Sequence, residues 1–306
     1  MIDFYGKRRI FYAISISIVI LGVVMSFVNG VKLDINFKGG SLLKYNFTGD
    51  LNADRAADVV SGIINRVVST QITTDLATNE KRLVINIAGN YGLDVKEQEK
   101  MDEALKKEFP NANLKLSESS MVEPFFGKKF LTNGIKAILL ASFFVVIYVW
   151  FSFRRIGGLS AGVMALVALL HDLLVVFATC VVFNIPIGDS FVAVALTIIG
   201  YSINDTIVIY DRIRENFKKY PKQSIETITN LSISQSMTRS INTNIAVFIS
   251  VAMIYILAAV NSIESVQSFA LPMAIGAISG CYSTICIAGP LWVSWKKFRG
   301  IEHKMQ

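Results

Sequence analysis

Charged residues are scarce in this sequence: they make up 17% of the 306 residues, whereas hydrophobic residues make up 53%. Soluble domains carry about 25% charged residues, so the composition excludes an ordinary soluble protein and indicates one embedded in a membrane. Six apolar runs are each long enough to cross about 30 Å of hydrocarbon as a helix. They are Ile10–Val28, Ile135–Phe153, Leu159–Phe183, Phe191–Tyr210, Ile241–Val260 and Phe269–Trp292.

Cysteine is scarce as well. The three cysteines, Cys180, Cys281 and Cys286, all fall within apolar runs. The long polar segment Gly30–Asn133 contains none, which excludes a disulfide framework there. The sequence also lacks a Gly-x-x-x-x-Gly-Lys-Ser/Thr phosphate loop, so this chain has no ATP-binding motif of that kind.

Lys and Arg are absent from two short connections, Asn184–Ser190 and Asn261–Ser268. If the N-terminus is cytoplasmic, fifteen of the 30 Lys and Arg fall on the cytoplasmic side, which is the positive-inside pattern. The segment Gly30–Asn133 then lies outside. Its fourteen basic residues are balanced by fourteen acidic ones, so its charge does not favour nucleic acid. Both termini are expected in the cytoplasm.

The outer segment has the residue pattern of a separate soluble domain. Strands are expected at Leu42–Thr48, Val67–Thr73, Arg82–Ala88 and Asn113–Ser119, and helices at Asn52–Arg66 and Val95–Phe109, with a turn at Asn79-Glu80. This βαββαβ order predicts a ferredoxin-like split βαβ fold. The predicted fold class is a membrane α-helical bundle of six transmembrane helices, with an extracytoplasmic α+β ferredoxin-like domain between spans one and two.

The predicted domains follow directly from these elements. Residues 1–29 form the cytoplasmic N-terminus and first transmembrane helix, and residues 30–133 form the ferredoxin-like domain. Residues 134–295 carry transmembrane helices two to six, and residues 296–306 are a cytoplasmic tail. The fold supports many functions and identifies none by itself.

Ionisable residues inside the apolar runs are the strongest functional signal. His171 and Asp172 lie near the middle of the third run, and Asp205 lies in the fourth. An ionisable group at this depth costs about 3 kcal/mol or more unless it faces protein or water. These residues are therefore expected to face the interior of the bundle.

Asp205 shares a helical face with Thr197 and Tyr201, which precede it by eight and four residues. Asn204 and Ser202 widen this polar stripe, which is expected to face protein. The fifth span is expected to open with the polar sequence Thr238–Asn244, which contains Arg239 and Thr243. Arg239 is a candidate counter-ion for Asp205, because both lie toward the cytoplasmic side. The charged tract Asp211–Lys222 is expected to be a cytoplasmic loop.

Several motifs resemble the SecF family. Gly200–Asn216 is similar to the fourth-span signature of this family, and Thr238–Thr243 is similar to its fifth-span motif. Val122–Gly127 resembles the segment before the second span, and His171-Asp172 stands where the family has a similar pair. The resemblance covers nearly the whole chain. One departure is Asn36, which replaces the Asp usually found in the family's Asp-Phe-x-Gly-Gly.

The resemblance implies a subunit of the Sec protein translocase, related to half of a transporter of the resistance-nodulation-division superfamily. It implies a SecD-like partner, association with the SecYEG channel, and the use of the proton-motive force to export preproteins across the bacterial inner membrane. Protons would be the coupling ion and no other cofactor is implied. The large domain would be periplasmic, and the chain would not be an enzyme.

Within that framework, Asp205, Arg239 and Asp172 form the predicted proton relay, with Asp205 as its principal group. Burial and a nearby arginine act on a carboxylate in opposite directions, which makes its protonation tunable. Thr197, Tyr201, Asn204, His171 and Thr243 are the predicted supporting residues.

Three other interpretations stay open at this point. The polar residues inside the membrane could simply hold the helices together by hydrogen bonds. Asp172 and Asp205 could form the dyad of an intramembrane aspartyl protease, although Asp205 lacks a Gly-x-Gly-Asp context. The chain could also belong to a small-molecule or lipid exporter of the same superfamily, although those typically carry two such halves in one chain.

Overall fold

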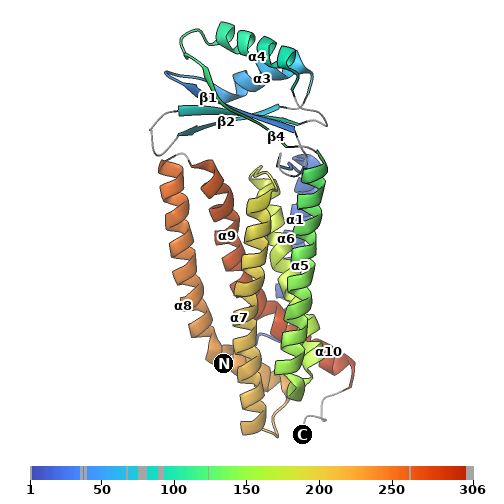
Figure 1. Cartoon of the computed structure of the whole chain (residues 1–306). Helices are drawn as coiled ribbons and strands as arrows, with labels where there is room; N and C mark the ends of the chain where they lie inside the picture. Colours follow the sequence, from blue (N-terminus) through green and yellow to red (C-terminus); the bar gives the residue numbers. More distant parts are fainter. Residues whose placement is uncertain are drawn as a thin grey trace.

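The computed structural model consists of a bundle of long helices with a small sheet-containing domain at one end (Figure 1). It describes residues 2–34, 37, 40–66, 68–74, 81–88, 93–122, 124–261 and 263–300. The predicted turn at Asn79-Glu80 and the substitution at Asn36 lie outside the described residues.

Six helical segments are long and apolar enough to cross a membrane, which confirms the six predicted spans. Five are continuous helices: α1 (Arg8–Val28), α5 (Pro124–Ser152), α6 (Gly158–Val182), α7 (Asp189–Lys219) and α8 (Ile225–Val260). The sixth consists of α9 (Glu264–Ser283), the π-helix η2 (Thr284–Ala288) and α10 (Gly289–Phe298). A short 3-10 turn, η1 (Arg154–Ile156), connects α5 to α6.

Two helices extend well beyond the predicted spans. The tract Asp211–Lys222, predicted as a loop, is helical as far as Lys219. The fifth span begins at Ile225 and not at Thr238, because the Ser224 side chain accepts a hydrogen bond from the Thr227 amide and caps the helix there. The prediction was wrong at these ends because an apolar run measures the thickness of hydrocarbon, not the length of the helix.

The π-helix lies immediately before a proline. Pro290 has no N–H to donate to the carbonyl of Cys286, one turn earlier, and its ring would clash with that carbonyl in a regular helix. The wider π turn removes this clash, which accounts for the irregularity at this point. Pro272 is also accommodated within a helix, α9.

The domain at the end of the bundle has the predicted order of strands and helices. Its elements are β1 (Gly40–Phe47), α3 (Ala53–Ile64), β2 (Val68–Thr74), β3 (Lys81–Ala88), α4 (Val95–Glu108) and β4 (Lys115–Val122). The four strands are antiparallel in the order β2-β3-β1-β4. Figure 1 shows α3 and α4 on the face of the sheet that points away from the bundle.

The core of this domain lies between the sheet and its two helices. Leu43 and Tyr45 of β1 pack in one cluster with Val60 of α3 and Leu105 of α4. Leu116 was predicted to alternate with polar residues on β4, but it is exposed. The register of β4 against β1 shifts between Lys44 and Tyr45, and this irregularity breaks the alternation that the prediction assumed.

Candidate functional site

Asp172 of α6 is fully buried, and three serine hydroxyls donate hydrogen bonds to its carboxylate. Ser202 Oγ of α7 lies 2.8 Å from Asp172 Oδ2, and Ser283 Oγ of α9 lies 2.7 Å from the same oxygen. Ser279 Oγ, also of α9, lies 2.6 Å from Oδ1. Asp172 therefore joins three transmembrane helices at one point.

His171 extends this group of polar residues toward α1. Its Nδ1 lies 3.3 Å from Asp172 Oδ1, and its ring centroid lies 6.0 Å from that of Tyr282. The Tyr282 hydroxyl donates to the Phe11 carbonyl across 2.7 Å and lies 3.2 Å from Ser15 Oγ. The other ring nitrogen of His171, Nε2, is buried without a hydrogen-bond partner in the described part of the chain.

Asp205 of α7 forms a second buried site, on the side of that helix that faces α8. Its exposed fraction is 3%, and Asn244 Nδ2 donates to its Oδ2 across 2.7 Å. The same amide donates to the Ser240 carbonyl across 2.8 Å, which fixes its orientation. Asp205 thus has an uncharged amide as its direct partner.

Arg239 does not make a direct ion pair with Asp205. It is exposed on α8 and lies close enough for an electrostatic interaction with that carboxylate, but none of the ion pairs among the described residues includes it. The position that the sequence analysis assigned to Arg239 is held by Asn244, five residues further along α8. The predicted role of Arg239 in setting the charge balance stays a prediction.

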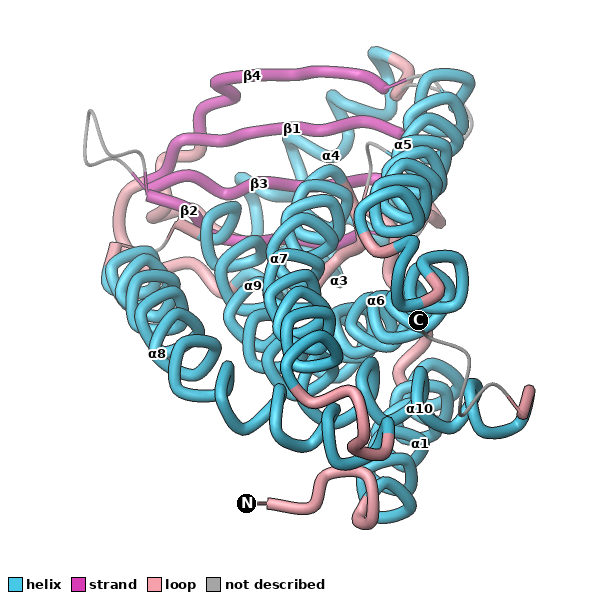
Figure 2. The backbone as a smooth tube through the Cα atoms, turned by 90° about the horizontal axis from the view of Figure 1, so that it is seen from below, coloured by secondary structure: helices cyan, strands magenta, loops and turns pink. Residues whose placement is uncertain are grey.

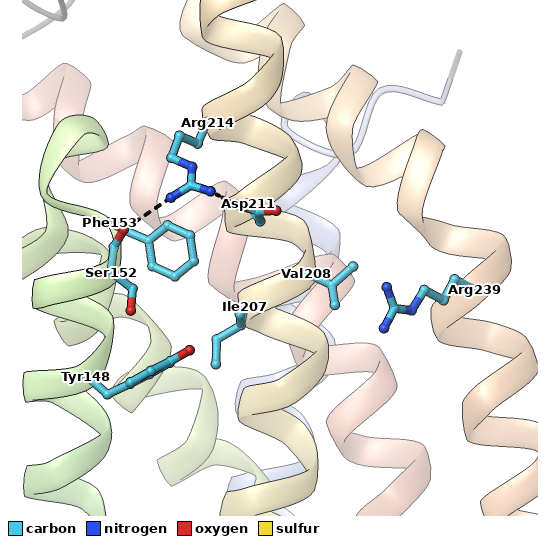
Figure 3. Close-up of a pocket in the computed structure, with 8 residues that line it drawn as sticks. All are labelled: Tyr148, Ser152, Phe153, Ile207, Val208, Asp211, Arg214 and Arg239. Atoms are coloured by element: carbon cyan, nitrogen blue, oxygen red, sulfur yellow. Dashed lines mark hydrogen bonds and ion pairs between the residues drawn. The ribbon is translucent and has the colours of Figure 1, made fainter.

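A cavity of about 410 Å³ lies beside Arg239, between α5, α7 and α8. Figure 3 shows the Arg239 guanidinium pointing toward Val208, with Asp211 and Arg214 further along α7. Arg214 forms an ion pair with Asp211 and donates to the Ser152 carbonyl across 3.5 Å. The cavity therefore has two arginines and one carboxylate in its walls.

The predicted supporting residues are only partly inside the bundle. Tyr201 is half-buried, and its hydroxyl has no partner among the described groups. Thr197 is exposed and donates to the Ala193 carbonyl of its own helix, while Asn204 and Thr243 are exposed as well. The stripe therefore runs from the interior at Asp205 to the surface of this chain.

The two aspartates are not arranged as a protease dyad. The donors to Asp172 come from α7 and α9, whereas the donor to Asp205 comes from α8. No hydrogen bond joins the two carboxylates in the part of the chain that the structure describes. A dyad requires two carboxyl groups that share one proton, so this geometry gives the protease interpretation no support.

Sequence reasoning missed Ser279, Ser283 and the partner role of Asn244. Ser279 and Ser283 are spaced by four residues, as are Ser240 and Asn244, so each pair shares one face of its helix. All four side chains are buried. Polar pairs at this spacing in an apolar run were the available signal.

Residues 100–298 match the family described as protein export membrane protein SecD/SecF, C-terminal. The chain is 30% identical over 302 residues to the protein translocase subunit SecF of Petrotoga mobilis, covering 97% of both chains. It is 32% identical over 305 residues to that of Thermobaculum terrenum, covering 97% of this chain and 94% of the relative.

Longer proteins match over part of their length. The protein translocase subunit SecDF of Bacillus subtilis is 30% identical, and the match covers 96% of this chain and 38% of the relative. A crystal structure of SecDF from Thermus thermophilus matches with a TM-score of 0.77 at 24% identity, covering 97% of this chain and 39% of that one. At this identity the structural match shows the shared fold.

Proposed function

Because the chain belongs to the SecD/SecF family of protein-export membrane proteins, we propose that it is a SecF-like translocase subunit that assists preprotein export across the bacterial inner membrane. The observation that carries this proposal is the match over 97% of the chain to relatives called protein translocase subunit SecF. The role is that of a transport subunit and not of an enzyme, with protons as the coupling ion.

The buried carboxylates support proton coupling. A charged carboxylate in a bundle is costly unless it is compensated, and neither Asp172 nor Asp205 has a Lys or Arg among its hydrogen-bond partners in the described residues. A proton removes the charge and with it the cost. Each of the two groups can therefore alternate between two states, and the helices that contact it can respond.

Asp205 is the better candidate for the group that gains and loses the proton. Asp172 is enclosed by three hydroxyl donors and His171, and it holds three helices together. Asp205 has the single Asn244 amide, and the residues around it lead to the surface of the chain through Asn204. Protonation of Asp205 would weaken the contact between α7 and α8, which is a simple way to move one helix.

A SecD-like chain is the proposed partner. The Bacillus subtilis relative and the SecDF crystal structure are more than twice as long as the part matched here, so their remaining length can supply what this chain lacks. Asn204 and Thr243 expose polar side chains at membrane depth on α7 and α8. Such groups are costly against lipid, and helices of a partner would cover them. The SecYEG channel and preproteins are the further proposed partners.

The proposed orientation places both termini in the cytoplasm and the sheet domain in the periplasm. The Lys and Arg distribution supports this orientation, because the connections at the sheet end of the bundle, Asn184–Ser190 and Asn261–Ser268, contain neither residue. The antiparallel order β2-β3-β1-β4 with two helices on one face supports a ferredoxin-like fold for this domain. A periplasmic domain on the first two spans could engage an emerging preprotein.

The test is export into inverted membrane vesicles that contain the Sec channel, with and without this chain and a SecD-like partner. We expect a proton gradient to stimulate export only when both chains are present. Vesicles whose gradient is collapsed by an uncoupler serve as the control. Equal stimulation without this chain would contradict the proposal.

A further inference from the structure

A cavity of about 400 Å³ opens at the end of the bundle away from the sheet domain, where the connection between α5 and α6 meets α10. Figure 2 shows this end of the bundle, with α10 beside α6. Three cationic side chains line the cavity, and none of the described residues that line it is acidic. The cations are Arg154, Lys296 and Arg299.

Lys296 is the central feature of this cavity. Only 5% of the residue is exposed, and its ammonium makes no hydrogen bond or ion pair among the described residues. Its nearest aromatic neighbour is the ring of Trp292, whose centroid lies 5.7 Å from Nζ. A buried ammonium without an anionic partner is costly, so the position is suited to an anion that enters the cavity.

The N-terminus of α6 lies in the same cavity wall. Gly157 precedes the helix with a φ of 87°, and no side chain caps the first turn. A Cβ at Gly157 would collide with Lys296 Nζ, so the ammonium sits directly against this turn. Ser160 donates its hydroxyl back to the Gly157 carbonyl and leaves the first-turn amides free of a side-chain acceptor. Free amides at the start of a long helix favour a negatively charged oxygen.

The two arginines have no carboxylate partners in the described part of the chain. The Arg154 guanidinium carbon lies 3.8 Å from the ring centroid of Phe151, and that of Arg299 lies 5.3 Å from that of Trp295. Stacking of this kind leaves the N–H donors of a guanidinium available at its edge. Both side chains can therefore contribute charge to an anion held by Lys296.

The cavity continues into an apolar surface. Trp150, Leu159 and Val163 line it and are exposed, Leu159 to 55%. Tryptophan is enriched at the boundary between headgroups and hydrocarbon. We propose that this cavity binds an anionic phospholipid, with the headgroup phosphate held by Lys296 and the first-turn amides of α6, and an acyl chain lying along Leu159 and Val163.

The neighbouring lysine is a matched control. Lys297 is exposed, forms an ion pair with Glu226 and lies over the ring of Tyr5 at 5.5 Å, so it is directed away from the cavity. A general attraction between anionic lipids and basic residues would involve both lysines. The proposed site involves only Lys296.

The experiment uses the full-length protein in zwitterionic detergent micelles and its intrinsic fluorescence. All three tryptophans of the chain lie at the cavity: Trp150 and Trp295 line it, and Trp292 contacts Lys296. Phosphatidylglycerol with brominated acyl chains should quench this fluorescence with a saturable dependence on lipid content. Lys296→Gln should weaken the apparent affinity about tenfold, the loss of one charge-assisted contact, and Lys297→Gln should change it less than about twofold.

Further arms separate the alternatives. Because Lys296 is buried, Arg299→Gln and Arg154→Gln provide exposed substitutions that leave the packing intact, and each should also weaken quenching. Brominated phosphatidylcholine should quench weakly, because its choline group meets three cations. Equal quenching by the two lipids, or no effect of any of the three cavity substitutions, would overturn the proposal. Displacement of the lipid by a few millimolar inorganic phosphate, but not by chloride at the same ionic strength, would overturn it in favour of a soluble phosphate site.

Discussion

The side chains of Ser202 and Asp205, three residues apart on α7, serve different buried sites. Ser202 donates to Asp172 across 2.8 Å, whereas Asp205 accepts from Asn244 across 2.7 Å. Helix α7 therefore contacts α6 through one carboxylate and α8 through the other. A movement of α7 that follows a change at Asp205 would be felt at Asp172, which gives the two sites a physical connection.

Asn244→Ala should destabilise the contact between α7 and α8. It removes the direct hydrogen-bond donor to Asp205 and leaves a buried carboxylate without its partner, at a cost of about 1–3 kcal/mol in the free energy of unfolding. Thermal or denaturant unfolding in detergent measures this change. Asn242→Ala, at an exposed position on the same helix, should alter stability by less than about 0.5 kcal/mol. Equal effects of the two substitutions would show that the Asn244 contact is unimportant.

Ser279→Ala and Ser283→Ala should each lower the stability of the bundle by about 1 kcal/mol, because each deletes one hydroxyl donor to Asp172. Unfolding in detergent is again the measurement. Ser268→Ala provides the control, since the Ser268 hydroxyl donates only to the Ser265 carbonyl of its own helix. Wild-type stability of the Ser279 and Ser283 variants together would exclude a structural role for the Asp172 cluster.

The Asp172 cluster also shows what could be predicted from sequence. Asp172 and His171 were identified because ionisable residues are rare in apolar runs. Ser279 and Ser283 are separated from Asp172 by 107 and 111 residues, and nothing local indicates which hydroxyl meets which carboxylate. Depth in the membrane could be derived from the sequence, whereas contact depended on how the helices pack.

The same contrast applies to the fold. The sheet domain was predicted closely, because alternation on β3 and the amphipathic helices α3 and α4 are local properties of the chain. The ends of α7 and α8 were not, because their cytoplasmic extensions are stabilised by packing and capping outside the apolar run. Arg239 was assigned to Asp205 by charge alone, and the shorter Asn244 side chain occupies that place.

The sheet domain should lose stability at high pH through Tyr45. Burial, and then the hydrogen bond to Asp102, raise the pKa of the Tyr45 hydroxyl above its usual value of about 10. The neutral tyrosine thus stabilises the folded domain below pH 10, and this contribution is lost as the pH rises toward the higher folded-state pKa. Hydrogen exchange of the domain in the full chain, measured from pH 9 to 11, tests this.

Tyr45→Phe is the corresponding variant. It lacks the titrating group, so its stability should fall less steeply above pH 10, although loss of the hydrogen bond to Asp102 costs about 1 kcal/mol at neutral pH. Parallel pH profiles for the variant and the wild type would argue against the assignment to Tyr45.

Single introduced thiols should report the orientation of the chain. Ser117→Cys, on exposed β4, should react with a membrane-impermeant reagent in intact spheroplasts, and Lys219→Cys, at the end of α7, should react only in inverted vesicles. The native cysteines lie within the spans, so the wild-type chain provides the background. The reverse labelling pattern would place the sheet domain in the cytoplasm.

The central claim, that Asp205 carries the coupling proton, is tested most directly by Asp205→Asn. The variant keeps the size and much of the hydrogen bonding of the side chain but cannot titrate, so the protein should assemble with its SecD-like partner. Asp211→Asn, an exchange on the same helix in the ion pair with Arg214, is the matched control. The measurement is proton-gradient stimulation of preprotein export in inverted vesicles. We expect Asp205→Asn to abolish the stimulation and Asp211→Asn to retain most of it, whereas full stimulation with well-assembled Asp205→Asn protein would contradict the account.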